Sequence, residues 1–253
     1  MKQIYTPYCG AAPSPDALWS SWNLDPVLLG AFVLAIPLYL MRSRGGTQAQ
    51  HSAFWVAYGL LALFLISPLC ALSSALFSIR VLHHVVLIGF VAPLLAVALR
   101  RETDENSANL LPLFFLVHTI IVWMWHAPVF YSMALASTSL FWVMELSLLL
   151  SAFFLWRAIF CAAVNPGLAL AGLLATVIQM GMLGALLTFT ERPMFIEHFL
   201  TTDAYGLTAM EDQQLAGLLM WVPAALPYLL AALITVFRLL SDKEPLAGVG
   251  NRE

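Results

Sequence analysis

RVLHHVVLIGFVAPLLAVAL, residues 80–99, is apolar over almost its whole length. About 20 such residues in a helix cross the hydrocarbon core of a membrane. The composition of the 253-residue chain agrees, because 61% of its residues are hydrophobic and only 10% are charged. A soluble domain carries roughly 25% charged residues. Since the apolar runs are continuous rather than alternating, the sequence predicts an all-α protein that crosses the membrane several times.

Seven apolar runs are candidates for membrane helices, and polar segments separate them. Neither a repeat nor a change of composition divides the chain, so we expect one membrane domain over residues 1–253. The sequence predicts a seven-transmembrane-helix bundle. Its expected spans are 26–42, 53–72, 81–99, 110–130, 139–160, 167–189 and 213–239.

The positions of the basic residues predict the orientation of this bundle. With seven spans, one side of the membrane collects eight of the eleven Lys and Arg residues, and the other side collects Lys2, Arg80 and Arg192. The side richer in Lys and Arg faces the cytoplasm. We therefore expect the N-terminus outside and the C-terminus in the cytoplasm, with most polar side chains of the spans in the outer half.

Histidines in that outer half are the main candidates for a functional site, because ionisable groups are costly in a membrane. His84 and His126 come at similar depth on neighbouring antiparallel spans and are expected to form a pair of metal ligands. His83 lies about 100° from His84 around a helix. We therefore expect His84 to face the bundle and His83 the membrane interface. Helix packing is the alternative role for an isolated histidine.

Other polar or sulfur-containing side chains are candidate supporting residues. Glu145 is a carboxylate inside a span, so it requires a proton, a cation or a metal nearby. It is expected to accept a hydrogen bond from a histidine ligand. Asp212 is either a metal ligand or the N-cap of the last span. The remaining candidates are Met180, which can also be a packing residue, Gln213, Gln214 and His118.

Three cysteines are widely spaced and predict no disulfide framework. Cys9 lies in the outer N-terminal segment, which we expect to be a loose tail or, with lower weight, a source of a soft-metal ligand. His198 is expected to be solvated in an outer loop.

Imidazole and thioether ligands together favour Cu(I) over Ca²⁺ or Mg²⁺, which prefer oxygen. A haem held by two histidines is the chief alternative. The two lysines lie outside the expected spans, which excludes a retinal Schiff base. The net charge of −3 and the lack of a basic stripe exclude a nucleic-acid partner. The sequence contains no motif of an ATPase, protease or hydrolase.

The segments PYCGAAPSP…WNLDP, RVLHHVVLIGFVAPLLAVAL, WMWHAPVFYSMAL, QMGMLGALLTF and DQQLAGLLMWVP occur in this order along almost the whole chain. Together they resemble the multispan CtaG-type cytochrome c oxidase assembly factors, in their proteobacterial form. The resemblance implies a multi-pass protein of the bacterial cytoplasmic (inner) membrane, with seven transmembrane helices. It also implies a role in respiratory chain biogenesis, as an assembly factor rather than an enzyme.

Copper delivery is the activity that this resemblance implies, which makes the protein a metallochaperone. The implied site residues are His84 with His83, His126 and Asp212. Many relatives carry a histidine one turn before the position of His84, where this chain has Arg80. We expect transient Cu(I) binding and transfer to cytochrome c oxidase subunits or other copper chaperones. A bis-histidine haem protein and a metal-free scaffold that docks oxidase subunits are the alternatives.

Overall fold

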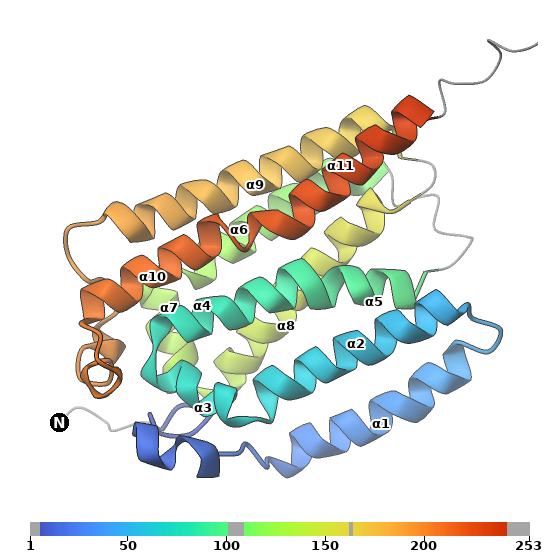
Figure 1. Cartoon of the computed structure of the whole chain (residues 1–253). Coiled ribbons are helices and arrows are strands. Elements are labelled where there is room, and N and C mark those ends of the chain that lie inside the picture. The colour runs from blue at the N-terminus through green and yellow to red at the C-terminus, as the bar shows by residue number, and fades with distance from the viewer. Residues whose placement is uncertain (1–5, 101–108, 162–163, 242–253) are drawn as a thin grey trace, which may run out of the picture.

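The computed structural model describes residues 6–100, 109–161 and 164–241. These residues fold into a bundle of α-helices without a β-strand, which confirms the expected all-helical class. The helices run roughly along one common direction, and α1 lies at the edge of the bundle (Figure 1). Their bounds are α1 Pro26–Arg42, α2 Gln48–Leu65, α3 Pro68–Ala75, α4 Phe77–Val86, α5 Ala92–Ala98, α6 Leu111–Trp125, α7 Pro128–Ala136, α8 Thr138–Ile159, α9 Pro166–Phe189, α10 Ala209–Trp221 and α11 Ala225–Ser241.

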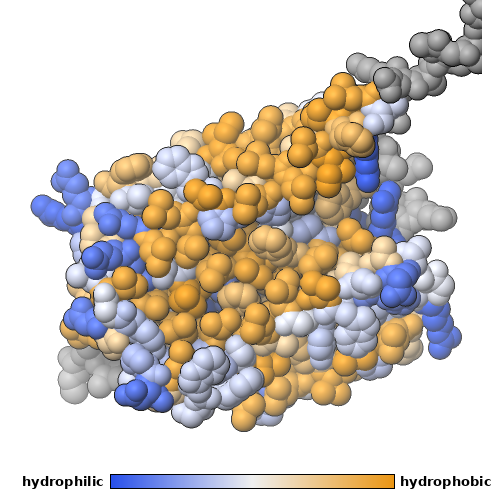
Figure 2. All heavy atoms as spheres, in the orientation of Figure 1, coloured by the Kyte–Doolittle hydropathy of each residue, from blue (hydrophilic) through white to orange (hydrophobic). Residues whose placement is uncertain are grey.

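The surface of the bundle is apolar between two polar ends (Figure 2). Many leucines and other large apolar residues are exposed on the long helices, including Leu150, Ile178 and Leu233. Such a continuous apolar surface is unfavourable in water and suited to lipid. The structure is therefore that of a multi-pass membrane protein.

Four to six membrane spans emerge from helix length and hydropathy among the described residues. Four are single candidates, at Phe77–Ala98, Thr138–Ile159, Pro166–Phe189 and Ala209–Ser241. Two more arise if each bent helix pair counts as one span: α2 with α3, bent by 51°, and α6 with α7, bent by 74°. α1 is apolar but shorter, at 17 residues. The expected runs 53–72 and 110–130 are thus broken rather than straight, because Pro68 and Pro128 each begin a new helix.

Phe77–Ala98 contains one irregular turn. A π-helical segment, Leu87–Val91, joins α4 to α5 directly after the two histidines. Such a turn breaks the regular helical hydrogen bonding. The indole N–H of Trp156 donates to the carbonyl of Ile88 at 2.9 Å and satisfies a group in this segment. Pro93 follows in the first turn of α5.

A disulfide between Cys9 and Cys70 ties the N-terminal segment to α3. The expectation of a loose tail without a disulfide is therefore wrong. The segment also packs on the bundle through Tyr8, which stacks on Phe141 with ring centroids 4.8 Å apart. The separation of 61 positions between the two cysteines explains why their spacing gave no signal.

Helices α9 and α10 approach each other closely at Gly184 and Gly217. A Cβ on Gly217 would lie 2.3 Å from Oγ1 of Thr188 and 2.6 Å from the carbonyl oxygen of Gly184. We expect Gly217→Ala to destabilise the protein by about 1–3 kcal/mol through overpacking. Thermal unfolding in detergent measures this change. Gly59→Ala is the control, since nothing lies within 4 Å of its Cβ position. Equal stability of the two variants would contradict the expectation.

Candidate functional site: a buried histidine–carboxylate cluster

Glu145 of α8 is the centre of a buried polar cluster. Its Oε2 lies 3.5 Å from Nε2 of His83, and its Oε1 lies 3.6 Å from Nε2 of His84. Both histidines belong to α4 and are buried, at 2% and 1% exposure. The expectation that His83 faces the membrane interface is therefore wrong. Phe64 of α2 stacks on the His83 ring, with centroids 5.3 Å apart, so α2 as well as α8 contacts this side chain.

Arg80 brings a permanent positive charge into the same cluster. Its Nη1 lies 3.6 Å from Oε1 of Glu145, and its guanidinium carbon lies 5.2 Å from the ring centroid of Phe141. The side chain is fully buried, so the expectation that Arg80 is a charge at the outer surface is wrong. The sequence spacing of Arg80 and the two histidines could have indicated this position. Arg80 precedes His83 and His84 by three and four residues, which places the three side chains near one helix face.

His126 joins the cluster from the C-terminal end of α6. Its ring is perpendicular to that of His84, with centroids 5.3 Å apart. Its Nδ1 lies 2.7 Å from the carbonyl oxygen of Val122, so Nδ1 carries the proton and donates it. Nε2 then has a free lone pair, and it is buried without a hydrogen-bond partner. This arrangement of the two ring nitrogens is the one that metal-binding histidines adopt.

Most polar atoms of the cluster have no hydrogen-bond partner. This holds for all three guanidinium nitrogens of Arg80, both ring nitrogens of His83 and His84, Nε2 of His126 and both carboxylate oxygens of Glu145. Buried polar atoms without partners are rare and call for a ligand, an ion or water. Among the described residues, however, no three His, Cys, Asp or Glu side chains are already arranged around a metal position. The donor set, imidazole nitrogens beside one carboxylate, is of a kind that suits metals preferring nitrogen.

Asp212 of α10 has a different role in the structure. Its carboxylate accepts hydrogen bonds from the backbone N–H groups of Phe77 and Ser78, at 2.6 and 3.1 Å, and from Oγ of Ser78 at 2.5 Å. Asp212 therefore caps α4, the helix of the two histidines. The cap of α10 itself is Thr208, which forms a capping box with Glu211.

The other predicted supporting residues lie in structural contacts. Gln213 accepts from the backbone N–H of Met194 at 2.7 Å and donates to the carbonyl of Leu187 at 3.2 Å. Nδ1 of His118 pairs with Ser151 at 3.0 Å. Met180 packs in the apolar core. Gln214 is partly exposed on the first turns of α10.

His198 is buried near the start of α4. It is 1% exposed, which corrects the expectation of a solvated loop residue. Its Nδ1 lies 3.2 Å from the carbonyl oxygen of Ala75, and its Nε2 lies 2.7 Å from the hydroxyl of Tyr131. Burial lowers the pKa of His198 to about 4, so the ring is neutral and accepts from Tyr131. The charge of Arg80 contributes to this lowering of the pKa.

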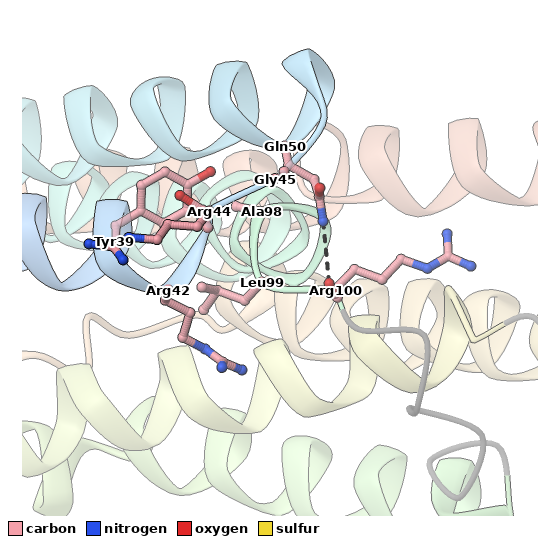
Figure 3. Close-up of a pocket in the computed structure, with 10 residues that line it drawn as sticks. Tyr39, Arg42, Arg44, Gly45, Gln50, Ala98, Leu99 and Arg100 are labelled. Carbon is pink, nitrogen blue, oxygen red and sulfur yellow. Dashed lines mark hydrogen bonds between the residues drawn. The ribbon is translucent and has the colours of Figure 1, made fainter.

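A pocket of about 200 Å³ lies where α1 ends and α2 begins. Arg42, Arg44 and Arg100 are among its lining residues, and Gln50 donates to the carbonyl of Arg100 at 3.3 Å. The side chains of Arg42 and Arg100 point in different directions rather than toward one centre (Figure 3). The pocket is separate from the buried cluster.

The fold and the cluster together define a polytopic helical membrane protein with an intramembrane histidine–carboxylate site. The family model described as cytochrome c oxidase caa3 assembly factor (Caa3_CtaG) matches residues 110–242, slightly more than half of the chain. The chain belongs to this family of assembly factors, which are not enzymes. The match includes His126, Glu145 and Asp212 and begins after His84. No curated protein and no solved structure matches the chain.

Proposed function

We propose that this protein binds Cu(I) transiently and delivers it to a haem–copper cytochrome c oxidase during assembly. The observation that supports the proposal is a group of buried nitrogen atoms without hydrogen bonds, on His83 and His84 beside Glu145 and on His126, whose ring contacts His84. Imidazole nitrogen is a suitable ligand for copper, and the carboxylate compensates the charge of the ion. Membership of an oxidase assembly family supports the oxidase as the proposed recipient of the copper.

His84 and His126 are the proposed principal ligands, because their rings are in contact and belong to different helices. His83 is the proposed third ligand. Arg80 opposes firm retention, since its permanent charge shares Glu145 with the copper ion and repels it. Weak retention suits a protein that passes its metal to a partner by ligand exchange.

The proposed setting is the bacterial cytoplasmic membrane, crossed seven times with α1 as the first span. The first described residues and the end of α11 lie at opposite ends of the bundle, in agreement with an odd number of crossings (Figure 1). Basic residues gather at the C-terminal ends of α1, α5 and α11, which favours this end of the bundle as the cytoplasmic side. His84 is the eighth residue of the stretch that begins at Phe77, which places it roughly 10 Å from the outer end of that stretch. Copper thus reaches the site from outside, and oxidase subunits or another copper chaperone receive it there.

Copper content tests this proposal. We expect near-stoichiometric Cu(I) in the purified wild type loaded under reducing conditions, and at least a tenfold weaker affinity in the His84→Ala/His126→Ala variant, because two ligands are lost. His118→Ala is the matched control, since it removes a buried histidine that pairs with Ser151 instead. Mass spectrometry of the metal and a competition titration give the readout. A copper-free wild type, or equal copper in both variants, would contradict the proposal. A Soret band would favour haem binding instead.

A further inference from the structure

The Cys9–Cys70 disulfide lies beside the aromatic layer that covers the buried cluster. Tyr8, the residue before Cys9, stacks on Phe141 and meets the edge of Trp142 at 5.2 Å. Phe141 in turn faces Arg80, which pairs with Glu145. A continuous set of contacts therefore joins the disulfide segment to the proposed copper site.

Each sulfur of this disulfide has a polar side chain next to it. Nδ2 of Asn23 donates to Sγ of Cys70 at 3.6 Å, and Oγ of Ser73 lies 4.0 Å from Sγ of Cys9. The single hydroxyl proton of Ser73 is also within reach of the carbonyl of Cys70, at 2.6 Å. A disulfide sulfur gains little from a donor, whereas a thiolate is stabilised by one. The amide of Asn23 thus offers one donor to a thiolate at Cys70, whereas the Ser73 proton is already donated to the Cys70 carbonyl.

We propose that Cys9 and Cys70 are a second metal site, which binds one Cu(I) ion between two thiolates once the disulfide is reduced. This inference rests on the proposed copper-delivery function and extends it to an outer acceptance site. Thiolates are soft ligands that select Cu(I). On reduction, Nδ2 of Asn23 remains as a donor to Sγ of Cys70.

The reduction needs an external dithiol as its electron donor. One thiolate of the donor attacks a sulfur of the Cys9–Cys70 bond, and the mixed disulfide is resolved by the donor's second thiol. Two electrons and two protons pass to the pair, and the donor leaves as a disulfide. Binding of Cu(I) then displaces the two thiol protons. The oxidised form keeps Tyr8 stacked on Phe141, and the reduced form accepts the metal.

The test compares Cu(I) stoichiometry of the oxidised and the dithiol-reduced full chain in detergent, with bicinchoninate as competitor and alkylation to count free thiols. We expect one additional Cu(I) per reduced chain, with sulfur ligands visible by X-ray absorption at the copper edge. This copper disappears in Cys9→Ser/Cys70→Ser and persists in Cys161→Ser, which keeps the Cys9–Cys70 pair.

The outcomes separate this site from the histidine site. If His84→Ala/His126→Ala loses no copper while the extra copper of the reduced chain remains, the histidine site fails and the cysteine site stands. Equal copper in the oxidised and reduced wild type would overturn the cysteine site. A disulfide that resists excess dithiol in the folded protein, or extra copper that remains in the double serine variant, would also overturn it.

Discussion

Replacing Glu145 by methionine is expected to destabilise the protein by about 3–5 kcal/mol, because the buried charge of Arg80 loses its counter-ion. Both side chains are at most 4% exposed, so water cannot replace the carboxylate. The Phe141 ring compensates only a small part of this loss. Equilibrium unfolding in mixed detergent micelles, followed by tryptophan fluorescence, measures the difference.

A double-mutant cycle separates the ion pair from simple packing. Arg80→Met alone leaves the Glu145 carboxylate without its permanently charged partner and is also expected to destabilise. The combined Arg80→Met/Glu145→Met variant removes both charges and is expected to recover most of the loss, since apolar residues can replace a buried pair. Additive effects of the two substitutions would show that Arg80 and Glu145 do not depend on each other.

Asp212→Ala is expected to cost roughly 3 kcal/mol or more, since a capping carboxylate with three buried donors is lost. The two N–H groups of Phe77 and Ser78 then remain buried without an acceptor. Because they begin the helix of His83 and His84, we also expect weaker copper binding. Thermal unfolding and a Cu(I) titration measure the two effects.

Glu211→Gln is the matched control for this experiment. Glu211 is the neighbouring acidic residue on α10, and glutamine can retain its capping box with Thr208. We expect a change within ±0.5 kcal/mol, as for most surface substitutions. If Asp212→Ala behaves like Glu211→Gln, the capping role of Asp212 is wrong.

Helical class and family were predictable from the sequence, because apolar run length and ordered motifs carry that information. The proximity of His84 to His126 and to Glu145 was also predictable. Antiparallel neighbouring spans bring residues of equal depth close together. The inward position of His83 could not be predicted from α4 alone. It depends on Phe64 of α2, which stacks on the His83 ring.

Other features depend on pairings that lie far apart in the chain. Cys9 and Cys70 are 61 residues apart, and Asp212 is 135 residues from Phe77. Local patterns carry no information about such pairs. Arg80 was misplaced for a related reason. Its charge was counted by position near a span end, whereas a carboxylate on another helix holds it inside.

The cap of α4 has a consequence for the order in which the protein matures. Residues 77 and 78 enter the membrane early, whereas their acceptor, Asp212, belongs to the last span of the chain. In a protein inserted span by span, the first turn of α4 lacks this acceptor until α10 has been inserted. We therefore expect a truncated protein that lacks α10 to hold the histidines of α4 less firmly.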